Sequence, residues 1–385
     1  MQIHAFAFLQ KTMRRKKSNF LSIVLSPFSL IYGAVIGTRN LMFEWGLLPV
    51  TEFHLPVISV GNITVGGTGK TPHVEYLVEL LKDEFSLATL SRGYKRKTRR
   101  FIIADATSSA SQVGDEPRQM KQKYPELTVA VDRNRVKGIR TLLKLKKPVG
   151  VVLLDDAFQH RYVQPGKSIL LVDYNRPVTE DCLLPAGRLR EPAAARKRAD
   201  IILITKSPKR LKPIDMRNMA TRLGLGFHQH LYFTSIEYGR IRPVFKISEV
   251  RDEDYFKKKK VPVLLLSGIA NPRPLRTFAR RISTQLHEVR FPDHHRYSAR
   301  DIDKISARFE ATNDPDTMIL TTEKDAMRLQ EAELPESLKN KIYYVPIRVV
   351  FLNDDQDEFN QIILNYVRSN QRNNILHKKP DQSST

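Results

Sequence analysis

Short apolar runs alternate with helix-forming segments over the first 225 residues. Runs of consecutive apolar residues are typical of strands that helices cover on both faces of a parallel sheet. Helices are expected to start at Lys70, Pro117 and Val136. The alternation predicts an α/β fold with a doubly wound, mostly parallel sheet. Its strands are expected at residues 57–60, 87–90, 101–104, 128–131, 149–154, 168–172 and 201–205.

The pattern changes after residue 225. Residues 228–245 alternate apolar and polar positions around Tyr238-Gly239, which predicts a β-hairpin that links two domains. Strands expected at 261–266, 318–320 and 342–351 then indicate a second, smaller α/β domain that ends in a helix to about Ser369. The predicted parts are an N-terminal segment (1–40), a first α/β domain (41–225), a two-stranded β linker (226–248), a second domain (249–369) and a disordered tail (370–385).

A basic cluster precedes an apolar stretch near the N-terminus. Residues 20–37 are apolar but contain Pro27 and three serines, and the stretch is slightly short for a membrane-spanning helix. We expect a helix that associates with a membrane surface, held on acidic lipid by the basic residues. A first helix buried in the core is the alternative. The basic cluster contains Lys11, Arg14, Arg15, Lys16 and Lys17.

A glycine-rich loop between the first strand and the first helix carries the clearest chemistry. It reads Thr64-Val-Gly-Gly-Thr-Gly-Lys-Thr71, so Thr64 stands where the usual P-loop pattern has its first glycine. A strand, a glycine loop and a helix N-terminus together bind phosphate through backbone N–H groups. The interpretation assigns nucleotide binding to Gly66, Gly67, Thr68, Gly69, Lys70 and Thr71, with the Thr71 hydroxyl on Mg²⁺.

Acidic and basic residues follow the ends of the other predicted strands, where an open α/β sheet binds its ligands. Asp155-Asp156 follows the most apolar strand, which is the Walker-B arrangement that positions Mg²⁺. Arg92 and Tyr94 are placed to meet phosphate or substrate, although a solvent-exposed basic loop explains them equally well. Asp115-Glu116 precedes a helix, where acids often only complement the helix dipole.

Composition limits the possible partners and the compartment. The chain has 385 residues and a net charge of +23, from 64 Lys and Arg against 41 Asp and Glu. Such a surplus indicates an anionic partner, which can be nucleic acid, acidic lipid or a phosphorylated substrate. Cys182 is the single cysteine, so an internal disulfide and a cysteine metal cluster are excluded, and a reducing compartment is the simplest interpretation.

Seven sequence blocks in order resemble the tetraacyldisaccharide 4′-kinase family, the lipid A 4′-kinases of Gram-negative bacteria. The resemblance covers most of the chain, and the threonine in the P-loop agrees with the family's own loop. The blocks are Val60–Pro72, Ser91–Tyr94, Gly114–Pro117, Asp155-Asp156 with Gln159-His160, Leu184–Glu191, Phe291–His294 and Thr322–Asp325.

The resemblance implies transfer of the ATP γ-phosphate to the 4′-hydroxyl of a tetraacyldisaccharide 1-phosphate, the lipid A precursor. It further implies two α/β domains joined by two strands, with ATP and Mg²⁺ between them, at the cytoplasmic face of the bacterial inner membrane. The expected partners are this lipid and acidic membrane lipid. No nucleic acid and no obligate protein partner is expected.

The resemblance also assigns roles to residues. Asp115 is expected to be the catalytic base, supported by His294, which is preferred over His295 because of its position after the aspartate. Lys70 and Arg133 are expected to hold the transferred group, and Arg135 in the same turn is the alternative to Arg133. The remaining assignments are Thr71, Glu116, Asp155 and Asp156 for the metal, and Arg92, Tyr94, Gln159, Arg188 and Arg190 for the substrate.

Two other functions remain open from the residues alone. A P-loop kinase of a soluble small molecule would have the N-terminal apolar stretch in its core. A nucleotide switch or nucleic-acid-binding protein would use the positive charge, but no helix-turn-helix pattern and no basic motif interleaved with aromatic residues stands out.

Overall fold

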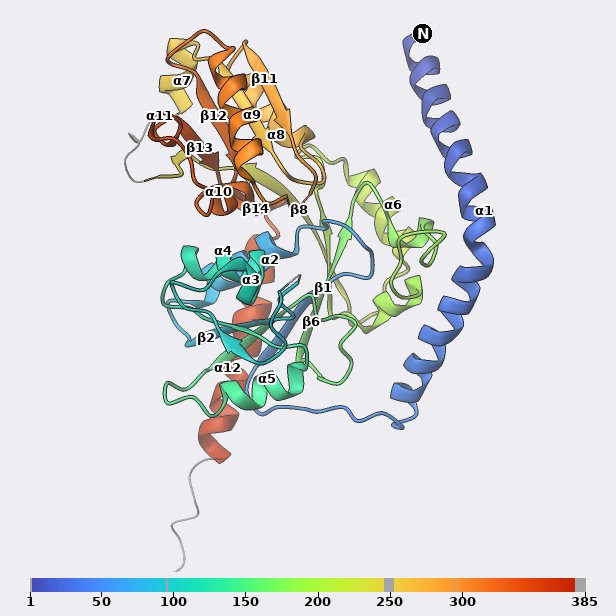
Figure 1. Cartoon of the computed structure of the whole chain (residues 1–385). Helices are drawn as coiled ribbons and strands as arrows, with labels where there is room; N and C mark the ends of the chain where they lie inside the picture. The colour runs from blue at the N-terminus through green and yellow to red at the C-terminus, as the bar shows by residue number, and fades with distance from the viewer. Residues whose placement is uncertain (1, 95, 246–252, 294, 378–385) are drawn as a thin grey trace, which may run out of the picture.

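Two α/β units and a long N-terminal helix form the molecule (Figure 1). The computed structural model describes the backbone of residues 2–94, 96–245, 253–293 and 295–377. It describes the side chains of these residues except 2–21, 253, 257 and 371–377. The masked positions include His294 and residues 246–248 of the predicted linker.

The larger sheet is mostly parallel, and in the described chain its order is β14-β8-β7-β6-β1-β5-β2-β4-β3. Only β3 and β14 run antiparallel to their neighbours β4 and β8. The apolar runs therefore predicted the buried parallel strands β1, β2, β4, β5, β6 and β7 correctly. Their bounds are β1 (Val57–Gly61), β2 (Leu87–Ser91), β3 (Ile102–Ile103), β4 (Thr128–Val131), β5 (Val151–Asp155), β6 (Lys167–Asp173), β7 (Ile201–Thr205), β8 (His230–Tyr238) and β14 (Ile347–Phe351).

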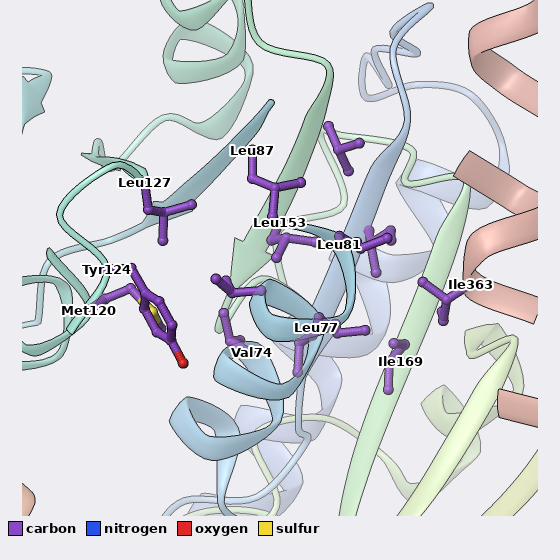
Figure 2. Close-up of a cluster of buried hydrophobic side chains, with 14 of the residues drawn as sticks. Val74, Leu77, Leu81, Leu87, Met120, Tyr124, Leu127, Leu153, Ile169 and Ile363 are labelled. Carbon is purple, nitrogen blue, oxygen red and sulfur yellow. The ribbon is translucent and has the colours of Figure 1, made fainter. Parts of the chain in front are cut away.

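Helices cover both faces of this sheet, as a doubly wound fold requires. On one face, α2, α4 and α12 bury Leu77, Met120 and Ile363 against the strands (Figure 2). On the other face, α5 and α6 bury Ile139 and Leu223 against alternate residues of the same strands. The helices of this unit are α2 (Lys70–Leu81), α3 (Ala110–Val113), α4 (Asp115–Lys123), α5 (Arg135–Leu142), α6 (Pro213–Leu223) and α12 (Gln356–His377), with short 3₁₀ turns η1 (Val178–Glu180) and η2 (Ala193–Arg198).

The smaller unit is a second α/β layer with the sheet order β11-β10-β12-β13-β9. Its core packs α7 and α8 on one face of the sheet and α9, α10 and α11 on the other. The elements are β9 (Arg242–Pro243), β10 (Val263–Ser267), β11 (Leu286–Arg290), β12 (Met318–Thr322), β13 (Ile342–Val345), α7 (Glu253–Lys259), α8 (Arg273–Ile282), α9 (Ala299–Glu310), α10 (Glu323–Leu329) and α11 (Glu336–Lys339).

The link between the units differs from the predicted hairpin at 226–248. Strand β8 does not pair with β9; it pairs with β14, with Tyr238 opposite Ile347 and Thr234 opposite Phe351. Strand β9 pairs with β13 in the smaller sheet. Two strands do join the units, but they lie more than 100 residues apart in the chain. The alternating pattern identified a strand correctly and its partner wrongly.

Two further predicted boundaries differ from the structure. The strand expected at 342–351 is two strands in different sheets, β13 and β14, separated by Pro346, which has no N–H to continue a ladder. The disordered tail was predicted to begin at residue 370. Helix α12 instead continues past Ser369 to His377. Residues 378–385 of that tail lie outside the described residues.

The N-terminal segment is one helix, α1 (Gln2–Glu44), with Pro27 inside it. From Ser22 to Glu44 it is long and apolar enough to cross a membrane, with a mean hydropathy of 1.3, and only 6% of this apolar window is buried in the protein. Figure 1 shows it lying along one side of the larger unit. A helix buried in the core, the alternative prediction, is therefore excluded.

Candidate active site

The loop between β1 and α2 has the geometry of an anion site. Gly66 and Gly69 have φ angles of +108° and +90°, which residues with a Cβ rarely adopt. Gly69 precedes α2 directly, and no side chain of the described residues caps the helix there. The first N–H groups of α2 can therefore bind phosphate oxygens, and the helix dipole favours the negative charge.

Lys70 and Asp156 meet at the mouth of this loop. Lys70 Nζ lies 3.5 Å from Asp156 Oδ1, and Arg190 Nη1 lies 3.2 Å from the same oxygen. Burial alone raises the pKa of Asp156, but the positive charges of Lys70 and Arg190 outweigh it and hold this pKa below its usual value. Asp156 is therefore an ionised carboxylate held between two cations.

Asp155 lies in a different environment from its neighbour. It ends β5, is only 8% exposed, and its Oδ1 has no hydrogen-bond partner among the described residues. Burial, followed by the negative charges of Glu116 and Asp156, raises the pKa of Asp155 to about 7. A buried carboxylate oxygen without a partner is costly, so this atom is expected to receive a ligand.

A buried arginine lies behind these acids. Arg135 is 3% exposed, and its Nη2 donates to the Asp155 carbonyl at 3.4 Å. Burial lowers the pKa of Arg135 to about 10, although Asp156 and Asp155 oppose that shift. Arg133, the predicted catalytic arginine, is exposed in the turn before it. Both arginines belong to one Asp-Arg-Asn-Arg turn, and the sequence carries no signal that separates them.

One pocket collects the predicted acids and the basic turn after β2. Ser91 to Tyr94, Asp115 to Pro117, and Asp155 with Asp156 line it together. Tyr94 is 62% exposed at the rim. The carboxyl ends of β2 and β5 thus meet the start of α4, as expected for an open α/β sheet.

The smaller unit contributes two cations to the acids of α4. Lys324 Nζ lies 2.8 Å from Glu116 Oε1, and Arg328 Nη2 lies 3.0 Å from Asp115 Oδ2. Burial raises the pKa of Glu116, but Lys324 and then Lys70 outweigh it and lower this pKa below its usual value. Both cations belong to α10, so the two units meet at the predicted catalytic carboxylates.

Further ion pairs lie outside the pocket along the contact between the two units, which we call the seam. Arg118 pairs with Glu331, and Lys123 lies between Glu75 at 2.6 Å and Glu323 at 3.4 Å. Together with the two pairs above, helix α4 therefore contacts α10 and the residues just after it through charges of opposite sign along its length.

Two predicted substrate residues lie away from this pocket, and the structure does not describe the predicted histidine. Gln159 donates its amide N–H to the Asn62 carbonyl at 2.8 Å and does not line the pocket. Arg188 is exposed, and its carbonyl accepts the Val65 N–H at 2.8 Å. His294 lies outside the described residues. Its neighbour His295 contacts Asp301 at 3.0 Å and stacks on Phe291 with ring centroids 4.6 Å apart.

Comparison with known proteins identifies the family. Residues 21–368 match the family described as Tetraacyldisaccharide-1-P 4′-kinase. The chain belongs to the tetraacyldisaccharide 4′-kinase family. Proteins named tetraacyldisaccharide 4′-kinase from Bacteroides thetaiotaomicron and Bacteroides fragilis are each 48% identical to it, over 92% and 93% of this chain and 96% of each relative.

A solved structure supports the same family. The crystal structure of LpxK from Aquifex aeolicus in complex with ATP is 29% identical, with a TM-score of 0.71, and the match covers 90% of this chain and 99% of the other. The tetraacyldisaccharide 4′-kinase assignment confirms the predicted fold class and reaction: an ATP-dependent lipid A kinase that phosphorylates an alcohol group. It decides against a kinase of a soluble molecule and against a nucleotide switch.

Some residues at the site of this tetraacyldisaccharide 4′-kinase family member were not predicted from the sequence. Lys324 and Arg328 were not predicted, although Lys324 belongs to the Thr-Glu-Lys-Asp block that supported the resemblance. Arg135 was left open beside Arg133. The sequence does not indicate which acids Lys324 and Arg328 contact, because Glu116 and Asp115 lie 208 and 213 residues earlier in the chain. Only the packing of α10 on α4 reveals these partners.

Proposed function

We propose that this pocket binds ATP on the P-loop and directs its γ-phosphate to the 4′-hydroxyl of the lipid A precursor. The observation that carries the proposal is one pocket whose lining includes Asp115 of α4, Asp155 and Asp156. Asp155 Oδ1 has no hydrogen-bond partner among the described residues, and Asp156 pairs with Lys70 at the start of α2. Phosphoryl transfer depends mainly on positioning and on neutralising charge, and these groups supply both.

The phosphates are held by the loop and by cations. The N–H groups of residues 66–71 and the Lys70 ammonium bind the β- and γ-phosphates. Arg190, which pairs with Asp156 beside Lys70, adds a second positive charge next to the phosphates. Arg133 keeps its predicted role on the transferred group, whereas Arg135 supports Asp155 from behind.

The residues present also fit Mg²⁺. Asp155 offers an unpartnered oxygen, and Thr71 is buried at the start of α2. Among the described residues, no group of three or more His, Cys, Asp or Glu forms a complete metal site. Mg²⁺ does not need one, because it is usually held by one or two carboxylates together with phosphate oxygens and water. When bound, Mg²⁺ neutralises phosphate charge.

Of the predicted metal ligands, Asp155 is the best supported. Glu116 and Asp156 are already paired with cations, with Lys324 and with Lys70 and Arg190. We therefore assign Asp155 and Thr71 as ligands, and Glu116 and Asp156 as residues that orient the surrounding cations.

Asp115 is the base. It lies half-buried in the pocket wall, with Arg328 fixing its Oδ2 at 3.0 Å. As the 4′-oxygen bonds to the γ-phosphorus and the bond to the ADP oxygen breaks, the hydroxyl proton passes to the Asp115 carboxylate. His294 remains the expected partner of this carboxylate. Arg92 and Tyr94 at the rim bind the disaccharide. Gln159 and Arg188 are not kept as substrate contacts, because neither lines this pocket.

Helix α1 brings the protein to its substrate. One face of it exposes apolar side chains, including Phe28 at 59% and Ile31 at 65% exposure, and a basic cluster precedes them in the sequence. An amphiphilic lipid is available only at a membrane, and acidic lipid attracts Lys and Arg. ATP is cytosolic, so we assign the protein to the cytoplasmic face of the inner membrane.

Replacement of Asp115 tests the assignment of the base. We expect Asp115→Asn to lower the rate of label transfer from γ-labelled ATP to the lipid by at least about 100-fold, the usual contribution of general base catalysis. ATP binding should remain within a few fold of wild type. Near-normal kinase activity of Asp115→Asn would show that another group takes the proton.

A further inference from the structure

Helix α1 has a second face that contacts the protein. Its exposed face carries Phe28, Ile31 and Val35. Its other face carries Ser29, 8% exposed, and Phe43, 6% exposed. Phe43 lies under the guanidinium groups of Arg39 and Arg161, at 5.2 and 5.1 Å from its ring centre. Both Arg39 and the buried serine contact loops that are hydrogen-bonded to the segment containing the P-loop.

The first route runs through the loop at residues 183–190. Ser29 Oγ donates to the Leu183 carbonyl at 3.0 Å and accepts the Ala186 N–H at 2.9 Å. Tyr32 donates its hydroxyl to the Arg190 carbonyl at 2.9 Å. The helix thus holds both ends of this loop.

The other side of the same loop is bonded to the P-loop. The Arg190 N–H donates to the Ile63 carbonyl at 2.7 Å, and the Val65 N–H donates to the Arg188 carbonyl at 2.8 Å. The Arg190 side chain reaches Asp156 beside Lys70. One residue, Arg190, therefore connects Tyr32 of α1 with the phosphate-binding loop and its lysine.

The second route runs through Gln159. Arg39 Nη2 donates to the Gln159 carbonyl at 2.9 Å. The Gln159 amide donates to the Asn62 carbonyl at 2.8 Å, and Asn62 Nδ2 donates to Thr68 Oγ1 at 2.9 Å. Asn62 is fully buried and Thr68 is 3% exposed, so water does not compete for this bond. This series of hydrogen bonds ends at Thr68, inside the glycine-rich loop.

We propose that Tyr32 and Arg39 are positioning residues of the ATP site, so that α1 helps to build the nucleotide pocket as well as to contact the membrane. The proposal rests on the assignment of ATP to the P-loop made above. Neither side chain touches the nucleotide. Tyr32 acts through Arg190, and Arg39 acts through Gln159 and then Asn62; both routes fix the loop that carries Lys70.

Two substitutions on the inner face test the proposal in the full-length protein. Tyr32→Phe removes one hydroxyl, and Arg39→Gln removes the guanidinium. We expect KM for ATP and the Kd for ATP to rise about threefold to tenfold for Tyr32→Phe, the effect of one lost hydrogen bond. Arg39→Gln should raise both by about tenfold or more because its donor is charged. Partitioning into phosphatidylethanolamine and phosphatidylglycerol vesicles should stay as in wild type.

Phe28→Ser on the outer face is the matched control. We expect it to weaken vesicle partitioning and to leave the Kd for ATP in detergent unchanged. Wild-type ATP binding by both Tyr32→Phe and Arg39→Gln would overturn the proposal, as would equal losses of ATP binding and thermal stability in both. Lys70→Ala tests the assignment of ATP to the P-loop separately from the role of α1. Wild-type ATP binding by that variant would refute the P-loop assignment itself.

Discussion

Asp155 and Asp156 are adjacent in the sequence, but the fold gives their carboxylates opposite properties. Asp155 ends β5 in a buried position, where burial raises its pKa to about 7. Asp156 adopts a left-handed φ of +50°, uncommon for a residue other than glycine, and meets Lys70 and Arg190. The sequence predicted an acidic pair at the end of a strand. It could not divide their roles, because the division depends on one backbone angle and on cations from distant segments.

Removal of the Asp155 charge should change the Mg²⁺ requirement. We expect Asp155→Asn to raise the free Mg²⁺ concentration for half-maximal kinase activity by at least about tenfold, because the neutral amide is a weaker ligand. Activity is measured over a Mg²⁺ titration at fixed ATP. ATP binding in EDTA serves as the control and should not change. An unaltered Mg²⁺ requirement would remove Asp155 from the proposed ligand set.

His73 should make stability depend on pH. Its Nδ1 lies 2.7 Å from the Gly69 carbonyl and its Nε2 lies 3.0 Å from Thr234 Oγ1. Burial lowers the pKa of His73 from 6.5 to about 4. The unfolded chain therefore binds more protons between pH 4 and 6.5, so the free energy of unfolding falls as the pH falls through this window.

Replacement of this histidine should flatten that dependence. We expect His73→Gln to lower the slope of unfolding free energy against pH by up to roughly 1.4 kcal/mol per pH unit between pH 4 and 6.5. Urea unfolding at several pH values gives the slope. Some dependence should persist, because burial also lowers the pKa of His160 to about 4. A slope identical to that of wild type would mean that His73 titrates normally in the folded protein.

At the scale of elements, strands were predictable and their partners were not. A strand covered on both faces has a local signature, its apolar run, so β1, β2, β5 and β7 were found near their true bounds. Pairing is not local. Strand β8 skips the nearby β9 and pairs with β14, which the sequence analysis had merged with β13 across Pro346.

The contact between α4 and α10 can dock the two units or position Asp115, and two variants distinguish these roles. Arg328 is held by Asp325 at 3.0 Å and presents a second nitrogen to Asp115. We expect Arg328→Gln to lower kcat about 10- to 100-fold, the effect of one lost charged hydrogen bond, with KM for ATP nearly unchanged. Kinase kinetics at saturating lipid give both values.

Glu331→Gln is the control for that variant. Glu331 pairs with Arg118 in the same seam and does not line the acidic pocket. Its loss should weaken docking between the units while kcat stays within about threefold of wild type, as is usual for a partly exposed ion pair. Equal losses of kcat in the two variants would mean that α10 only docks the units and does not position the base.

At the scale of the whole molecule, the site lies where three separately encoded parts meet. The P-loop unit supplies Lys70 and the acids, the smaller unit supplies Lys324 and Arg328, and α1 holds the loop that carries Arg190. The sequence indicated each part, since each has a local pattern. The contacts between the parts had to come from the structure, because they join residues up to about 200 positions apart.

Transfer of phosphate from ATP to a lipid in this pocket can be measured in one assay. Full-length protein is incubated with γ-labelled ATP and tetraacyldisaccharide 1-phosphate, beside Lys70→Ala. We expect label in the lipid with wild type and its loss by at least about 100-fold with Lys70→Ala. Lipid labelling that survives in Lys70→Ala, or ATP hydrolysis by wild type without any labelled lipid, would contradict the proposed function.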